Sequence, residues 1–174
     1  MTIRRIECLI ASALAGLALA STSAAQTPGP QASGSEPYVV SDANAGTTPI
    51  QGDTVYKAFH EQAGISRLVA SLVKLYRSDP RLKDIFAAAD DAKLQKLLTE
   101  QICFITGGPC RYTGRDMVAA HKDMGVQQAD FNALVEDLQM SMDQEQVPVW
   151  AQNRLLAKLA PMQRVIVARK GYRG

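Results

Sequence analysis

Apolar residues recur at helical spacing in four segments of the chain, within residues 65–76, 94–105, 131–138 and 155–166. The first stripe ends at the turn sequence Ser-Asp-Pro, and the second ends at Gly107, Gly108 and Pro109. Pro161 lies inside the fourth stripe and is expected to kink that helix, because proline has no backbone N–H. No segment shows strand alternation bounded by hairpin turns. The pattern therefore predicts an all-α domain with four main helices and short accessory ones.

The first 25 residues differ in composition from the rest of the chain. Two arginines precede an apolar run that is too short to span a bilayer comfortably, and the small residues Ser23, Ala24 and Ala25 follow. Residues 1–25 are therefore predicted to be a secretory signal peptide that is cleaved after Ala25. The mature protein is expected to be exported, periplasmic or secreted, with no membrane anchor. An uncleaved membrane anchor is the alternative interpretation of this segment.

The next stretch, residues 26–52, is rich in Gly, Pro, Ser and Thr and has few large apolar side chains. Such a segment cannot bury enough surface to offset the entropy lost on ordering, so a disordered linker is expected here. Helical periodicity begins at about Asp53, and the folded domain is expected over residues 53–170.

The charge of the chain argues against one class of partner, and its cysteines leave two possibilities open. The chain has 19 basic and 17 acidic residues, and the basic ones are scattered without interleaved aromatics, so no nucleic-acid partner is expected. Cys8 would leave with the signal peptide, which leaves Cys103 and Cys110 in an oxidising compartment. A bridge between them would contribute about 2–3 kcal/mol on the chain-entropy model. Their spacing equally permits two separate buried thiols.

His121 is the candidate functional residue, since Met117 and Met124 can share its face of a short helix. A histidine on an apolar face can simply be a structural residue. A zinc site would need further ligands, but the chain has no second histidine nearby and no CxxC motif. A nucleophilic pair with Cys110 lacks an evident orienting carboxylate. One imidazole is sufficient to ligate haem iron, because the porphyrin supplies the other four nitrogens.

Residues 104–121 follow the pattern F-x-T-G-G-P-x-x-Y-T-G-x-x-M-x-x-x-H, which resembles the signature of the first group of truncated haemoglobins. The resemblance covers about residues 53–169. YKAFHEQAGISRLV is similar to the family's opening helix and turn, although His60 and Glu61 stand where two glycines are usual. SDPRLKDIF, VQQADFNALVEDL and VPVWAQNRLLAKLAPM resemble later segments of the same fold.

This resemblance implies a truncated globin fold, a two-on-two α-helical sandwich around haem b (iron protoporphyrin IX), with His121 as the iron ligand. Gly107, Gly108 and Gly114 would let the preceding loop turn tightly and approach the porphyrin edge. Lys93 and Tyr112 would lie near the haem propionates, although Lys93 suits a solvated surface equally well. Phe86 would pack on the haem face. Further pocket positions, each of which could also be plain core, are Met117, Val126, Phe131 and Leu134.

The resemblance also locates the opposite, distal side of the haem. The family's tyrosine position falls on Val73, its polar positions on the next long helix fall on Leu94 and Leu98, and a deeper aromatic position falls on Ile102. All four residues are apolar. Losing a buried hydrogen bond costs about 1.5–3 kcal/mol, which is a ten- to hundredfold weaker hold on O2. Gln101 or Tyr76 could replace the missing donor if a helix were rotated.

The expected function is reversible binding of a diatomic gas (O2, CO or NO) by an exported haem protein, rather than catalysis. CO and NO should bind readily and O2 weakly. A haem enzyme on the same fold is the alternative. NO dioxygenation would need an unidentified reductase, and peroxidase chemistry would need a distal acid–base group that Val73, Leu94 and Leu98 do not supply. A haem-free interaction protein is the third interpretation.

Overall fold

The computed structural model describes residues 37–167, and in this range the chain is helical with no β-strand. The predicted signal peptide and residues 26–36 lie outside the described residues, as do residues 168–170 of the predicted domain. No helix within residues 37–167 is both long and apolar enough to cross a bilayer. In chain order the elements are the 3-10 helix η1 (Asp42–Ala45), α1 (Thr54–Ala58), α2 (Glu61–Ser78), α3 (Asp91–Ile105), α4 (Met117–His121), α5 (Gln128–Gln144), α6 (Val149–Leu159), the 3-10 helix η2 (Ala160–Met162) and α7 (Gln163–Ile166).

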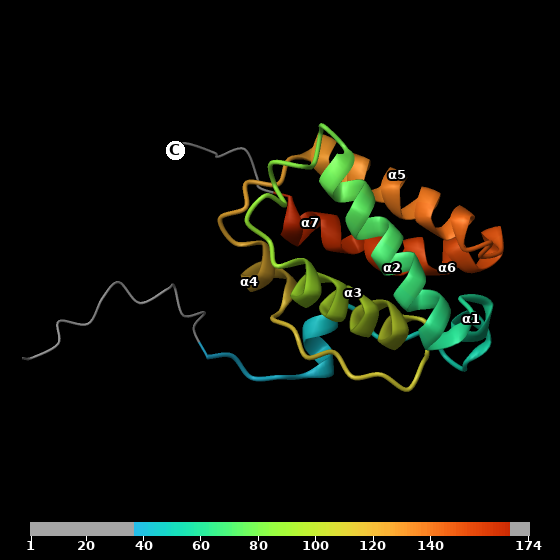
Figure 1. Ribbon diagram of the computed structural model, residues 1–174. Helices are drawn as coiled ribbons and strands as arrows, with labels where there is room; N and C mark the ends of the chain where they lie inside the picture. The colour runs from blue at the N-terminus through green and yellow to red at the C-terminus, as the bar shows by residue number, and fades with distance from the viewer. Residues whose placement is uncertain (1–36, 168–174) are drawn as a thin grey trace, which may run out of the picture. The chain divides into compact units, whose positions relative to one another are not determined.

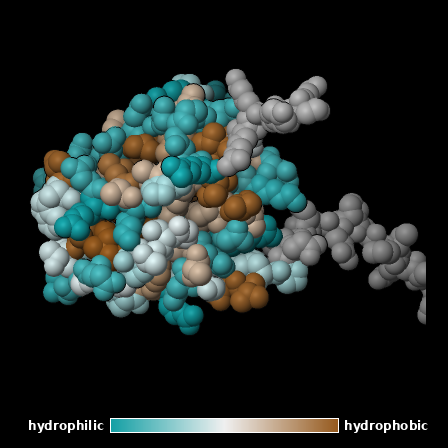
Figure 2. All heavy atoms as spheres, turned by 180° about the vertical axis from the view of Figure 1, so that it is seen from behind, coloured by the Kyte–Doolittle hydropathy of each residue, from teal (hydrophilic) through white to brown (hydrophobic). Residues whose placement is uncertain are grey.

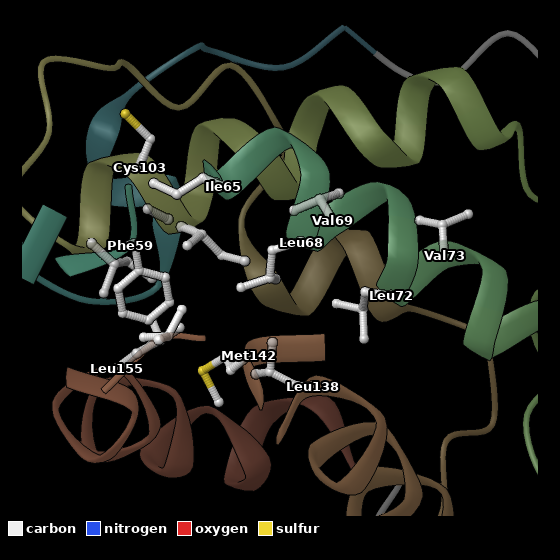
Figure 3. Close-up of a cluster of buried hydrophobic side chains, with 14 of the residues drawn as sticks. Phe59, Ile65, Leu68, Val69, Leu72, Val73, Cys103, Leu138, Met142 and Leu155 are labelled. Atoms are coloured by element: carbon white, nitrogen blue, oxygen red, sulfur yellow. The ribbon is translucent and has the colours of Figure 1, made fainter. Parts of the chain in front are cut away.

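Four long helices form the body of the fold, as the apolar stripes predict. Helix α2 packs against both α3 and α5, and Figure 1 shows α2 and α3 as one pair with α5 and α6 as the other. The predicted stripe of α2 is entirely buried. Leu68 and Leu72 point from α2 toward Leu138 and Met142 of α5 in the close-up of the core (Figure 3). Side chains at spacings of three and four residues thus face the same neighbouring helix, as the helical period requires.

The interruption predicted at Pro161 is present. Helix α6 ends at Leu159, Pro161 lies in η2, and the chain resumes as the short α7. Because proline cannot donate to the preceding turn, the two helical pieces do not form one continuous helix.

The expected disordered linker is wrong for residues 37–52. Ser41 caps η1, and Ala45 in η1 is completely buried. The Ile50 N–H donates to the Ile105 carbonyl over 2.8 Å, and the Gln101 side chain donates to the Ala45 carbonyl over 2.9 Å. The composition of this segment indicates how little apolar surface it can bury. Composition does not show, however, that backbone groups of the segment form hydrogen bonds with α3. These hydrogen bonds hold the segment in place.

The turn between α1 and α2 explains why glycines are usual there. His60 and Glu61 have φ angles of 58° and 57°, in the left-handed region that only glycine adopts without steric cost. His60 is exposed and stands at the N-terminal cap of α2.

Candidate functional site

His121 is the last residue of α4, whose first turn is capped by the Asp116 carboxylate accepting the Ala119 N–H over 3.0 Å. The imidazole is half-buried, and its Nδ1 lies 2.8 Å from the Met117 carbonyl oxygen. A carbonyl can only accept, so the hydrogen of a neutral imidazole is on Nδ1. Nε2 then carries the free lone pair. A backbone carbonyl that fixes one ring nitrogen in this way is typical of histidines that ligate a metal through the other.

The loop before α4 is fastened to α3 and to the N-terminal segment. Cys103 of α3 and Cys110 are joined by a disulfide with a Cα–Cα distance of 5.7 Å, which resolves the two alternatives left by their spacing. The Tyr112 N–H donates to the Asp42 carboxylate over 3.1 Å. Thr113 donates from its N–H and its hydroxyl to Glu100 Oε2, over 3.0 and 2.7 Å. The loop residues that lead to His121 are therefore held from two directions.

The Glu100 carboxylate holds this loop by accepting hydrogen bonds. Its second oxygen accepts from Lys96 Nζ over 2.6 Å. Burial by itself would raise the pKa of the Glu100 carboxyl, but the hydrogen bonds from Lys96 and Thr113 outweigh burial and hold the pKa below its usual value. The side chain is therefore ionised at neutral pH, which strengthens both of the hydrogen bonds that it accepts from Thr113.

The glycines of the loop meet other parts of the chain. Gly107 has φ +89°, and a Cβ there would lie 2.1 Å from the Gly52 carbonyl oxygen. At Gly114 a Cβ would lie 2.2 Å from the Tyr112 hydroxyl oxygen. At both positions any side chain would overlap another part of the protein, the N-terminal segment at Gly107 and a loop side chain at Gly114. The approach of these glycines to the porphyrin edge stays a prediction.

The predicted pocket residues divide into three sets. Val73, Phe86, Ile102 and Met117 belong to one buried apolar cluster, and Phe86 stacks on Tyr76 with ring centroids 4.6 Å apart. Half-buried side chains packed against this cluster are Leu94, Leu98 and Leu134. Val126 is buried and Phe131 half-buried, but neither belongs to the cluster. Seven of the predicted positions therefore belong to the hydrophobic core of the domain or pack against it, and they come from α2, α3, α4, α5 and the segment that carries Phe86.

The two predicted propionate partners differ in their surroundings. Lys93 is exposed on the first turn of α3. Tyr112 is only 4 % exposed, and its hydroxyl donates to the Arg115 carbonyl over 3.2 Å within the loop. Burial raises the pKa of Tyr112 to about 12, with a smaller contribution from nearby charged side chains. The tyrosine thus has a packing role inside the loop that the sequence motif alone does not reveal.

Gln101 and Tyr76, the two alternative distal donors, both make contacts elsewhere in the fold. The Gln101 amide nitrogen donates to the Ala45 carbonyl and lies 3.3 Å from the Met117 sulfur, so it is engaged by the N-terminal segment and by α4. Tyr76 is buried against Phe86, and burial, aided by the nearby charge of Asp137, raises the pKa of its hydroxyl.

Arg77 is a positioning residue that the sequence does not single out. Its guanidinium donates to the Phe86 and Ala89 carbonyls and to the Asp91 carboxylate, and so connects α2 to the segment that carries Phe86 and to the start of α3. An arginine at the end of a helix usually faces solvent, and no motif marks these carbonyl partners.

The residues present fit a haem. Within residues 37–167 no three His, Cys, Asp or Glu side chains lie close enough together to hold a bare metal ion. His121 offers one oriented imidazole with a free Nε2, and the half-buried Leu94, Leu98 and Leu134 offer apolar surface against the core cluster to which Met117 belongs. A porphyrin-bound iron needs one protein nitrogen and an apolar enclosure for the ring.

Comparison with known proteins identifies the family to which this fold belongs. The model of the bacterial-like globin family matches residues 54–168, so the chain belongs to that family of haem-binding globins. Within it the chain is similar to truncated haemoglobins of group 1. It is 31% identical over 85 residues to the one from Tetrahymena pyriformis, covering 49% of this chain and 70% of the relative. It is 34% identical over 89 residues to GlbN of Nostoc sp., covering 51% of this chain and 75% of the relative.

Solved structures confirm the two-on-two helical fold. The crystal structure of the Tetrahymena pyriformis truncated haemoglobin in its Fe(III) form superposes with a TM-score of 0.63 at 23% identity, covering 66% of this chain and 98% of that one. A group II truncated haemoglobin from Bacillus anthracis gives a TM-score of 0.62 at 22% identity, with 72% and 98% coverage. The predicted family and fold class are therefore confirmed.

Proposed function

We propose that this protein holds haem b through His121 and reversibly binds a diatomic gas on the other face of the haem. The observation that carries the proposal is the hydrogen bond from His121 Nδ1 to the Met117 carbonyl, which leaves Nε2 as the free lone pair. When bound, haem supplies an iron with an open coordination position for the gas. The chain's own contribution is to orient one imidazole and to surround the ring with apolar side chains.

The test of the iron ligand compares the two histidines of the chain. His121→Ala is expected to abolish or shift the Soret band, because no other imidazole follows the loop motif. His60→Ala is the matched control, since His60 is exposed at the cap of α2 and should leave the ferric spectrum unchanged. A wild-type Soret band in His121→Ala would overturn the assignment. Extraction of the pigment with acidified organic solvent would separate haem b from a covalently attached haem.

We further propose that the distal side discriminates against O2. It is formed by Val73 of α2 with Leu94 and Leu98 of α3, none of which has a side-chain donor. One of the two alternative donors, Gln101, has its amide nitrogen engaged by the Ala45 carbonyl. O2 polarises more strongly than CO when it binds, so it loses more from the missing hydrogen bond. The expected loss is about 1.5–3 kcal/mol.

The matched pair Val73→Tyr and Val73→Phe tests this selectivity. Both replace a buried valine by a large ring, and only tyrosine adds a donor. Val73→Tyr is expected to slow O2 dissociation about ten- to hundredfold relative to Val73→Phe, while the two variants differ little in CO dissociation. Stopped-flow ligand replacement measures both rates. Equal O2 rates in the two variants, or a wild-type O2 rate as slow as that of Val73→Tyr, would contradict the proposal.

Export to the periplasm or beyond is part of the same proposal. It is supported by the signal-like sequence of residues 1–25 and by the Cys103–Cys110 disulfide, a bond that persists mainly in oxidising compartments. Mass spectrometry of the protein from cell fractions would test it: a chain beginning at Gln26 outside the cytoplasm is expected. An intact N-terminus on cytoplasmic protein would contradict it.

A further inference from the structure

A groove lies where the segment after η1 runs beside α6. It has a volume of about 670 Å³ and is lined by residues 47–51 on one side and by α6 and Pro161 on the other. Neither His121 nor any residue of the predicted haem pocket lines it. Its size falls in the range of about 300–1,000 Å³ that is typical of small-molecule sites.

Two cations stand on the α6 wall of the groove. Arg154 and Lys158 are four residues apart on the helix and therefore project on the same side. No Asp or Glu lines the groove, and within residues 37–167 neither cation forms an ion pair. Within residues 37–167 a carboxylate pairs with each of Arg67, Arg77, Arg81 and Arg111, whereas several isolated surface cations, such as Lys74 and Lys83, form no ion pair either. The groove differs from these isolated positions in bringing two unpaired cations together on one helix face. The groove therefore concentrates positive charge that the described part of the chain does not balance.

The opposite wall supplies a hydroxyl and apolar surface. Lys158 Nζ donates to Thr48 Oγ1 over 3.2 Å, which holds the half-buried lysine at the groove. Because Thr48 accepts this bond through its oxygen, its own hydroxyl hydrogen is left to donate to a ligand. Ile50, Ala157 and Pro161 add apolar lining. The groove thus combines a guanidinium, an ammonium and a hydroxyl donor with an apolar side.

We propose that this groove binds a small organic phosphate. A phosphate monoester carries up to two negative charges and several acceptor oxygens, which match two cations and a hydroxyl donor. The groove is much larger than an inorganic phosphate, and its apolar side can pack against the organic part. An apolar peptide is a poorer match, because charged side chains occupy the α6 wall. The face shown in Figure 2 likewise has hydrophobic residues interspersed with hydrophilic ones, without one continuous apolar surface.

Isothermal titration calorimetry on the full-length protein tests the proposal with three probes: ribose 5-phosphate, inorganic phosphate and ribose. Ribose 5-phosphate is expected to bind saturably, inorganic phosphate more weakly, and ribose not at all. Raising the salt concentration should weaken ribose 5-phosphate binding, because salt screens the exposed Arg154. Absence of saturable heat at millimolar ribose 5-phosphate, or equal binding of ribose, would overturn the proposal.

Charge-removing variants locate the site. Arg154→Gln and Lys158→Gln should each weaken ribose 5-phosphate binding about tenfold or more, since each removes one charged donor. Lys74→Gln, at an exposed lysine of α2 that does not line the groove, is the matched control and should bind as the wild type does. Thr48→Val removes the hydroxyl alone and should give a smaller loss. Unchanged binding in the Arg154→Gln, Lys158→Gln double variant would overturn the assignment. The Soret band of each variant should equal that of the wild type, so this test is independent of the haem proposal.

Discussion

At the scale of single residues, the turn between α1 and α2 departs from the family pattern at a stability cost. His60 and Glu61 both have left-handed φ angles, which glycine adopts freely and other residues adopt with steric crowding of Cβ. The cost is about 1 kcal/mol for each residue, and it is partly offset because glycine has more conformational freedom to lose on folding. Neither side chain is buried, so nothing in the packing requires these residue types.

Replacing both residues by glycine should therefore stabilise the protein. The double variant His60→Gly, Glu61→Gly is expected to raise the free energy of unfolding by about 1 kcal/mol, measured by urea denaturation. Gln62→Gly is the neighbouring control. Gln62 is exposed on α2 and its φ is not positive, so glycine there should lower the free energy of unfolding by about 0.5–1 kcal/mol. A double variant that is less stable than the wild type would contradict this account.

At the scale of elements, α3 has two functions along its length. Leu94 and Leu98 lie on its first turns and belong to the predicted distal side. Glu100 and Cys103, further along, fasten the loop that leads to His121 on the proximal side. One helix therefore connects the two faces of the proposed site, and a substitution at Glu100 should change the position of His121.

The Glu100 anchor predicts a pH dependence of stability. The folded-state pKa of Glu100 is below the ordinary value of 4.5, so the contribution of its charge to stability is fully present above about pH 4.5 and is lost as the pH falls through the folded-state pKa. Glu100→Gln is expected to lower Tm at pH 7 by a few degrees and to differ less from the wild type as the pH drops below 4. Thermal unfolding followed by circular dichroism from pH 3 to 7 measures this. A difference in Tm that is constant over the whole range would show that the charge of Glu100 contributes nothing.

The same elements show how far the sequence predicts the structure. Apolar periodicity predicts α2, α3, α5 and α6 because their stripes face the core, fully buried in α2 and partly buried in the other three, and the loop motif singles out His121 as the candidate ligand. Periodicity could not predict the disulfide, since spacing alone leaves two thiols equally possible. It could not predict the roles of Arg77, Glu100 or Gln101 either. Their partners are backbone groups and a loop threonine that only the folded chain brings near, and no residue pattern encodes such contacts.

At the scale of the whole molecule, the folded domain begins earlier than the family match suggests. The match starts at residue 54, whereas the segment from residue 37 is packed on α3 and on the loop before α4. Asn44 donates from its side chain to the Gly114 carbonyl over 3.1 Å, and Ala45 is completely buried. The segment that composition identifies as a linker is a structural part of the globin.

Truncation tests this boundary. A protein that begins at Asp53 loses the hydrogen bonds made by Asp42, Asn44, Ala45 and Ile50, each of which contributes about 1 kcal/mol. It is expected to unfold about 10 °C or more below a protein that begins at Gln26, measured by differential scanning calorimetry. Equal Tm values for the two proteins would show that residues 37–52 add no stability.

The fastening of the loop before α4 has a consequence for how the cofactor is captured. The disulfide, Glu100, Asp42 and Asn44 all restrain residues 110–114, so the chain leading to His121 is ordered by contacts within the protein itself. Pre-organisation of this kind removes the entropy of ordering from the free energy of association. With His121 as the proposed iron ligand, haem affinity should therefore depend on these contacts far from the ring as well as on those that touch it.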